Sequence, residues 1–397
     1  MEIIIQELLK QIHKRLQLHS ETPLLDAQVL IAHHLEKPRT WVLAHPEAVL
    51  NSLQSEKIFQ STLRLEAGEP LPYILGHWEF FGLDFQITPD VLIPRPETEL
   101  IVETAINWLR SHPHKRKMID VGTGSGCIAI AIARNFTDLR ISMTDVSAQA
   151  LRVARLNVEK YALLDSVELI QSNLLEQVPT SSNFDLICAN LPYIPTKKLA
   201  SLPVAQSEPL LALNGGVNGL MIIEHLFEQV KTHLSPGGLI LVEIDPDQRI
   251  QMIHLLREHF PTAKFKFLQD LSANDRCIAV QLPFLVYHIC TREDWQNAQG
   301  SSLYKASSLN LEGFIHCSEI DQVIDVANRY YKGVPDLIVL SINPDKLTSE
   351  IRWEKSGDIY YPHVYGPINL NAVVSIKKLI LSSKGTFQAI LPKLETN

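Results

Sequence analysis

The chain has 397 residues, of which 46% are hydrophobic and 20% are charged, and this excludes a disordered or fibrous protein. At roughly 150 residues per domain, the length predicts two to three domains rather than one small module. The 36 basic residues are outnumbered by 44 acidic ones, giving a net charge of −8. An acidic chain is a poor candidate for binding phosphate backbones, so no direct nucleic-acid partner is expected.

Five scattered cysteines without a CxxC pair argue against a disulfide framework and a zinc site. No metal is therefore expected, and a reducing, cytoplasmic location is favoured. The segment Met1–Leu18 has helical spacing and an acidic start, so it is not a secretory signal. No apolar run approaches the roughly 20 residues that cross a bilayer, so no membrane partner is expected.

Residues 1–86 form the first predicted unit. Ile4, Leu8 and Ile12 follow helical spacing, and a second helix is predicted to start at Thr22-Pro23. With 7 basic and 11 acidic residues, this segment is predicted to be an acidic helical domain.

Short apolar runs alternate with helical stretches over residues 87–283. The predicted strands are Lys117–Val121, Arg140–Thr144, Val167–Ile170, Phe184–Cys188 and Gly238–Glu243. The predicted helices between them are Cys127–Asn135, Ser147–Ala162 and Gly219–His233. This alternation predicts an α/β domain with a doubly wound parallel sheet. Phe265–Leu268 and Arg276–Gln281 are expected to end it as an antiparallel pair.

The order of predicted strands and helices changes over residues 284–397, which predicts a separate α+β domain. Its predicted elements are strands at Leu285–Ile289, Phe314–Cys317, Leu337–Leu340 and Val373–Ile376, and a helix at Gln322–Tyr331.

A glycine-rich turn, Asp120-Val-Gly-Thr-Gly-Ser-Gly126, follows the first strand of the sheet. Glycine suits such a turn because a ligand can approach the backbone closely and positive φ is allowed. Asp145 ends the next strand, where a carboxylate can accept both ribose hydroxyls. A turn that binds nothing is the alternative. The GxGxG spacing resembles the S-adenosylmethionine loop of class I methyltransferases more than a nicotinamide fingerprint. The resemblance implies that cofactor and assigns it to Asp120, Gly122, Thr123, Gly124, Ser125, Gly126 and Asp145.

The segment Asn190-Leu-Pro-Tyr193 follows the fourth strand, at the sheet edge where doubly wound folds bind ligands. Similar motifs in class I methyltransferases mark methylation of a nitrogen in a planar amide or amine. The oxygens of the Asn190 side chain and the Leu191 backbone can each accept one N–H, which aims the nitrogen at the methyl group. Pro192 stiffens the loop and Tyr193 offers an aromatic face to the planar group. A loop without such a role is the alternative for this motif alone.

Other segments resemble the peptide-chain release factor glutamine N5-methyltransferases of the HemK or PrmC type over about residues 1–283. They are Glu69–Gly76, Phe80–Gly82, Leu92–Glu99, Ser207–Pro209, Ala212–Gly216, Gly219-Leu220 and Leu241–Ile244 with Gln248. The resemblance implies a class I methyltransferase with a Rossmann-like sheet, whose substrate is the glutamine amide of the Gly-Gly-Gln motif in class I release factors. It implies that the N-terminal domain grips the release factor. It places Asn173 or Leu174 beside the adenine, and Asn190 where cofactor and substrate meet.

Leu191 departs from the proline that family members often carry there, although its backbone carbonyl is retained. The same Asn-Leu-Pro-Tyr form occurs in ribosomal RNA adenine dimethyltransferases, so adenine N6-methylation of a nucleic acid is the main rival. The 18 basic and 21 acidic residues of segment 87–283 disfavour that rival.

Arg95 either contacts substrate or cofactor, or pairs with Glu97 to cap the helix that begins near Pro96; we favour the cap. Four histidines are expected to be solvated. They are His33, His34, His112 and His114.

Residues 284–397 resemble a family of small bacterial domains of unknown function, whose members resemble ADP-ribosyltransferases in fold. Five polar side chains interleaved with apolar strands are candidates for a cleft that binds a nucleotide or an NAD-like ligand. They are His288, His316, Glu354, His363 and Tyr365. The alternatives are hydrogen-bonded polar residues of a core, and a module used only for interaction or regulation.

Overall fold

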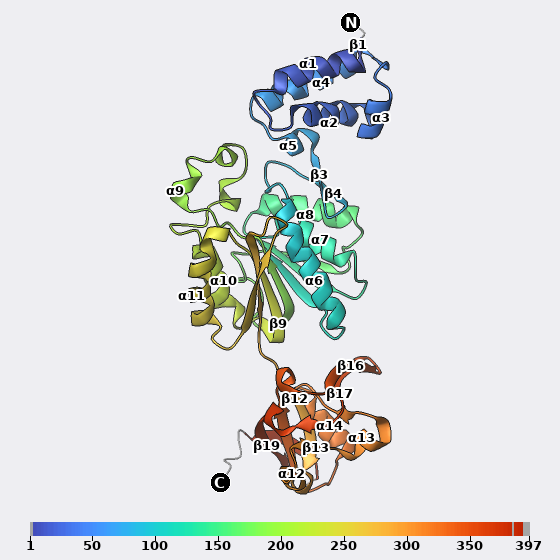
Figure 1. Cartoon of the computed structure of the whole chain (residues 1–397), viewed down its shortest axis with the longest axis vertical. Helices are drawn as coiled ribbons and strands as arrows, with labels where there is room; N and C mark the ends of the chain where they lie inside the picture. The colour runs from blue at the N-terminus through green and yellow to red at the C-terminus, as the bar shows by residue number, and fades with distance from the viewer. Residues whose placement is uncertain (1–2, 383–384, 392–397) are drawn as a thin grey trace.

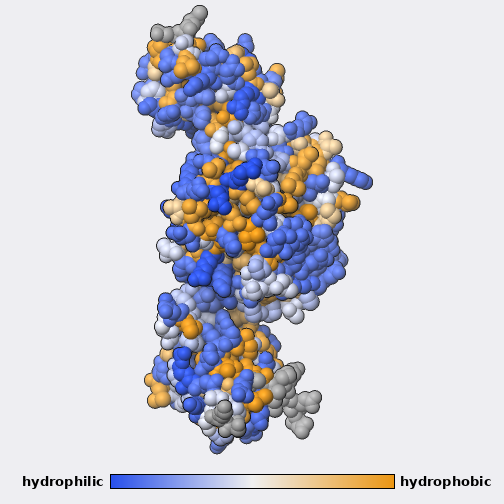
Figure 2. Space-filling view, turned by 180° about the vertical axis from the view of Figure 1, so that it is seen from behind, coloured by the Kyte–Doolittle hydropathy of each residue, from blue (hydrophilic) through white to orange (hydrophobic). Residues whose placement is uncertain are grey.

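The computed structural model describes residues 3–382 and 385–391. Three bodies follow one another along its long axis: a helical one, an α/β one and a C-terminal one (Figure 1). The space-filling view from behind shows narrow waists between the bodies, and hydrophobic residues on all three bodies, most extensively on the middle one (Figure 2). No helix among the described residues is long and apolar enough to cross a membrane.

The N-terminal body buries one face of each helix in a common core. In α1, Ile5, Leu8 and Ile12 are buried at helical spacing. α4 starts with a capping box in which Asn51 and Gln54 satisfy each other's backbone N–H groups. The elements are β1 (Ile3–Ile4), α1 (Ile5–Leu16), α2 (Pro23–Leu35), α3 (Arg39–Ala44), β2 (Val49–Leu50), α4 (Ser52–Glu66) and α5 (Leu71–Leu75). The two predicted helices are present, although residues 1–2 of the first lie outside the described residues.

A hairpin of β3 (His77–Phe80) and β4 (Leu83–Gln86) links this body to the next. Phe80 and Phe85 are buried with the helices of the α/β body. The hairpin therefore packs as part of the α/β core.

The α/β body is built on a seven-stranded sheet in the order β10-β11-β9-β8-β5-β6-β7. The strands are β5 (Lys117–Val121), β6 (Arg140–Asp145), β7 (Val167–Gln171), β8 (Phe184–Ala189), β9 (Leu234–Glu243), β10 (Lys264–Gln269) and β11 (Asp275–Gln281). β10 and β11 are antiparallel to their neighbours, whereas β9, β8, β5, β6 and β7 run parallel. The predicted strands and the terminal antiparallel pair are thus confirmed.

Helices cover both faces of this sheet (Figure 1), because its strands are apolar on both sides. One face carries α6 (Glu99–Ser111), α7 (Cys127–Ala133) and α8 (Ala148–Lys160). The other carries α10 (Met221–Val230) and α11 (Arg249–His259). Short turns of helix complete the body: η1 (Pro96–Thr98), α9 (Thr196–Leu199), η2 (Pro203–Gln206), η3 (Leu210–Ala212) and η4 (Pro246–Gln248).

The strand register brings three loops to one level at the carboxyl edge. Val121, the last residue of β5, pairs with Thr144 on one side and with Ala189 on the other. The residues that follow these three therefore emerge side by side, at the edge where doubly wound sheets bind ligands.

The C-terminal body consists of antiparallel sheets and short helices. A four-stranded sheet has the order β12-β15-β19-β20, a three-stranded sheet the order β14-β17-β16, and β13 pairs with β18. The strands are β12 (Val286–Thr291), β13 (Leu303–Tyr304), β14 (Ile315–His316), β15 (Leu337–Ile342), β16 (Glu350–Ser356), β17 (Ile359–Tyr365), β18 (Ile368–Asn369), β19 (Val373–Leu381) and β20 (Phe387–Leu391). The helices are α12 (Arg292–Gln299), α13 (Ser307–Glu312), α14 (Val323–Tyr330), η5 (Pro344–Lys346) and η6 (Leu370–Ala372). The predicted α+β character is confirmed.

The C-terminal body contacts the α/β body at the amino ends of the parallel strands. Lys115 Nζ lies 3.4 Å from Asp185 Oδ1 and 3.6 Å from Glu319 Oε1. The His114 ring stacks on Trp353 with 3.5 Å between centroids. The expectation that His114 is solvated is therefore wrong: its side chain is 6% exposed, and burial lowers the pKa of its imidazole. This contact lies across the sheet from the carboxyl edge.

Candidate active site

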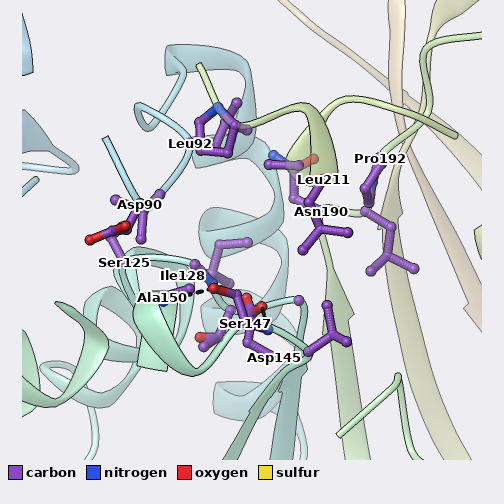
Figure 3. A pocket seen from close by; sticks show the side chains of 18 of the residues that line it. Asp90, Leu92, Ser125, Ile128, Asp145, Ser147, Ala150, Asn190, Pro192 and Leu211 are labelled. Carbon is purple, nitrogen blue, oxygen red and sulfur yellow. Dashed lines mark hydrogen bonds between the residues drawn. The ribbon is translucent and has the colours of Figure 1, made fainter. Parts of the chain in front are cut away.

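A cavity of about 250 Å³ opens at the carboxyl edge of the parallel strands. The loops after β5, β6 and β8 meet there, with the segment before η1 on the opposite wall. Figure 3 shows Asn190 and Pro192 on one side of the cavity, Asp145 and Ser147 below, and Asp90 across from them.

The glycine loop holds its shape only because glycine occupies key positions. Gly122 has a φ of 71°, and a Cβ there would lie 2.8 Å from Cδ2 of Leu191. A Cβ on Gly126, with a φ of 82°, would lie 2.7 Å from Cε of Met143. The loop is thereby pressed against both the segment 190–193, which contains Leu191, and strand β6, which contains Met143. At Gly124, apart from its own chain neighbours, no atom of the described residues lies within 4 Å of where a Cβ would stand, which leaves room for a ligand over the backbone.

The two predicted acids of the cofactor site occupy different places. Asp145 lines the cavity, and its two oxygens accept the N–H groups of Gly124 and Ser147, each at 2.9 Å. Asp120 is fully buried beneath the loop and does not line the cavity. It accepts the hydroxyl of Thr123 at 2.5 Å, and burial raises its pKa to about 7. The prediction that Asp120 contacts the cofactor is therefore wrong, because it supports the loop from below; Asp145 is the acid exposed to a ligand.

These residues fit S-adenosylmethionine. Each Asp145 oxygen keeps a lone pair after accepting one backbone N–H, as a ribose hydroxyl requires. Ile128, Val146 and Leu174 give the cavity apolar walls suited to an adenine ring. Asn173 also lines this wall. The described residues contain no group of three side chains that could hold a metal ion.

The Asn190 side chain belongs to a chain of hydrogen bonds that sequence reasoning missed. Its Nδ2 donates to Thr98 Oγ1 at 3.0 Å, and that hydroxyl donates to Glu243 Oε2 at 2.6 Å. The Tyr193 hydroxyl donates to Glu243 Oε1 at 3.1 Å. Glu243 is 3% exposed; burial raises its pKa to about 6, although both hydrogen bonds oppose the rise. Asn190, Leu191 and Thr98 line the cavity. Tyr193 does not, because its side chain is directed at Glu243, so the prediction that its ring faces the substrate amide is wrong.

The backbone of the segment 190–193 is held by Gln248. Gln248 Nε2 donates to the carbonyl oxygens of Tyr193 at 2.9 Å and Gly219 at 3.1 Å. A Cβ on Gly219 would overlap the Tyr193 carbonyl oxygen, and one on Gly215 would lie 2.7 Å from that of Pro192. These close approaches explain why glycines stand at both positions.

Arg95 does not pair with Glu97, so that prediction is wrong. Its guanidinium instead forms an ion pair with Glu208, which also accepts the Ile93 N–H at 3.1 Å. Arg95 does not line the cavity. It braces the segment whose Leu92 forms part of the wall.

Comparison with known proteins shows the family to which this chain belongs. Residues 7–76 match the PrmC N-terminal domain, and residues 98–267 match the methyltransferase small domain. The release factor glutamine methyltransferase of Moorella thermoacetica is 39% identical over 259 residues, covering 65% of this chain and 90% of that protein. This chain belongs to the release factor glutamine methyltransferase family. The family's enzyme from Aliivibrio fischeri is 34% identical over 278 residues, covering 70% of this chain and 96% of that protein.

The C-terminal body lies outside that match. Residues 289–376 match a protein family of unknown function, DUF952. The crystal structure of protein CC0527 from Caulobacter crescentus is 28% identical and covers 26% of this chain and 93% of that chain, with a TM-score of 0.25.

Four of the five predicted C-terminal cleft residues lie together on the three-stranded sheet. His363 Nδ1 lies 2.6 Å from Glu354 Oε2, and the Tyr365 hydroxyl donates to the same oxygen at 2.8 Å. The His316 ring is 5.0 Å from that of His363. His288 is not part of this group: its ring is buried between the His316 carbonyl and the Tyr304 hydroxyl.

Proposed function

We propose that this chain transfers the methyl group of S-adenosylmethionine to the side-chain amide nitrogen of the Gly-Gly-Gln glutamine in class I peptide chain release factors. The observation that carries this is the Asn190 amide, tied by its nitrogen to Thr98 and lining the same cavity as Asp145. Its Oδ1 receives no hydrogen bond from any described residue, so it is available to a substrate N–H. The cofactor supplies an electrophilic methyl group on a positively charged sulfur.

Residues of this chain then orient the side-chain amide of the substrate glutamine. Asn190 Oδ1 accepts one N–H and the Leu191 carbonyl accepts the other, which favours the pyramidal nitrogen of the transition state. Pro192 restrains the loop, and Asp145 holds the ribose. The methylated nitrogen is strongly acidic before it loses its proton, so no general base is required.

The domain boundaries are part of the proposal. We assign residues 1–76 to release-factor recognition, 77–283 to methyl transfer and 284–397 to a separate module; the first boundary, expected at residue 86, moves to 76 because the β3–β4 hairpin packs in the α/β core. The predicted segments 1–86, 87–283 and 284–397 carry net charges of −4, −3 and −1, so none is basic overall, which disfavours the rival adenine methylation of a nucleic acid. We also propose a cytoplasmic location, which the five free cysteines support.

A competition experiment tests the activity. The full chain is given methyl-labelled S-adenosylmethionine with equal amounts of release factor and ribosomal RNA. We expect label in the release factor. If only the RNA is labelled, the proposed function is refuted in favour of adenine N6-methylation of a nucleic acid.

We further propose that the C-terminal domain has an ADP-ribosyltransferase-like fold and binds a nucleotide at His316, Glu354, His363 and Tyr365. Support comes from the His363–Glu354 contact, because a carboxylate that fixes one ring nitrogen leaves the other for a ligand. Titration of the full chain with NAD, with saturating S-adenosylhomocysteine blocking the methyl-transfer cavity, should release heat that His363→Ala abolishes. If the wild type releases no heat, the nucleotide-binding role is refuted, and the C-terminal domain is then a module used only for interaction or regulation.

A further inference from the structure

The hydrogen-bond chain behind Asn190 has a fixed direction. Thr98 has one hydroxyl proton, and it is donated to the Glu243 carboxylate. The same hydroxyl can therefore only accept from Asn190, which must present Nδ2–H to it. Oδ1 is then the atom left toward the cavity.

We propose that Thr98 and Glu243 are positioning residues for methyl transfer: the buried carboxylate, acting through the Thr98 hydroxyl, holds Asn190 with Oδ1 toward the substrate nitrogen. This rests on the proposed function, because it concerns the atom that receives the substrate N–H. Thr98 is 2% exposed and Glu243 3%, so water does not compete for these bonds.

If these hydrogen bonds reverse their direction, the Asn190 amide takes the opposite orientation. A protonated Glu243 donates a proton to Thr98, and Thr98 then donates to Asn190. The amide must accept through Oδ1 and turns Nδ2 toward the cavity. Two N–H groups then face each other, which opposes substrate binding in the reactive pose.

The groups around the carboxylate set the pH at which this happens. The pKa of Glu243 is raised to about 6: burial is the main cause and Glu97 adds to it, whereas the two hydroxyls that donate to the carboxylate and the charge of Arg276 oppose the rise. Cys127 and Cys277 also face it, and burial raises the pKa of both thiols, so they stay neutral. Glu243 is therefore ionised above about pH 6 and protonated below it, and the correct Asn190 orientation is lost as the pH falls.

The experiment compares Thr98→Val, Thr98→Ser and Glu243→Gln in the full chain, with a release factor as substrate. Removing one preorganised group at a reacting centre costs about 100-fold in kcat. We expect that loss for Thr98→Val and Glu243→Gln, with the dissociation constant of S-adenosylmethionine changed less than threefold as a check on folding. Thr98→Ser keeps the hydroxyl and should retain most activity. Thr104→Val is the matched control, because the one hydrogen bond of the Thr104 hydroxyl to a described residue goes to Leu100 O of its own helix.

The pH profile separates positioning from a purely structural role. We expect the wild-type kcat to fall about tenfold per pH unit below pH 6, and this limb to be absent in Thr98→Val. A Thr98→Val enzyme as active as the wild type, or one that keeps the acid limb, would overturn the proposal. A wild-type enzyme that leaves the glutamine unmodified at every pH would instead refute the proposed function.

Discussion

Gly219 should be essential because its missing side chain makes room for the carbonyl oxygen of Tyr193. A Cβ there would overlap that oxygen and lie 2.6 Å from Gln248 Nε2, and its φ is 79°. The positive φ costs about 1–2 kcal/mol and the overpacking about 1–3 kcal/mol. Gly219→Ala should thus destabilise the domain by about 2–5 kcal/mol. For a domain of this size, each kcal/mol lowers Tm by about 2–4 °C.

Gly82→Ala is the matched control, because Gly82 has a φ of 70°, but no atom in the described part of the chain, its own neighbours apart, lies within 4 Å of where a Cβ would stand. It should show only the dihedral cost of about 1–2 kcal/mol. Calorimetry of the full chain measures both variants, using the transition that S-adenosylhomocysteine shifts. In Gly219→Ala the displaced carbonyl also moves Asn190, so kcat should fall at least tenfold. Equal Tm losses in the two variants, with unchanged kcat, would refute the contact argument.

Two further perturbations separate the cofactor site from the domain contact. Asp145→Ala removes hydrogen bonds to a charged group, so it should weaken S-adenosylmethionine binding by about 1.5–3 kcal/mol. At saturating cofactor, kcat should stay near that of the wild type. An unchanged dissociation constant by calorimetry would contradict the proposed contact of Asp145 with the ribose. Lys115→Met leaves Asp185 and Glu319 without their cation, so protease should cleave the interdomain segment near Leu282 faster while kcat stays unchanged. Equal cleavage of Lys115→Met and of the exposed control Lys117→Met would count against that contact.

The sequence predicts local features well because their causes are local. The glycine loop and Asp145 follow from short-range patterns, an apolar run that ends in glycines and an acid at the next strand end. Sheet register then brings the loops together, since Val121 lies between Thr144 and Ala189.

Features that depend on distant partners escape sequence reasoning. Thr98 is 92 residues from Asn190 and 145 from Glu243, so no spacing rule connects them. Arg95 has an acid two residues away, yet it pairs with Glu208, which lies 113 residues along the chain. A buried acid ending the apolar strand β9 was a usable signal for Glu243, of the same kind that singled out Asp145.

The C-terminal body shows the same limit. His114 lies in a polar stretch that predicts solvation, and only the packing of a second domain buries it against Trp353. From its residue type alone, His288 is predicted to line a cleft. Its two ring nitrogens instead bond to the His316 carbonyl and the Tyr304 hydroxyl, which makes it part of the core.

Fragment-ion mass spectrometry of the release-factor Gly-Gly-Gln peptide tests the central claim most directly. After incubation with enzyme and S-adenosylmethionine, the account predicts one methyl group on the glutamine side-chain amide. It predicts at least a 100-fold lower rate for Asn190→Ala at unchanged cofactor affinity, because that side chain acts on the reacting nitrogen. A methyl group elsewhere on the peptide, or full activity of Asn190→Ala, would contradict the account.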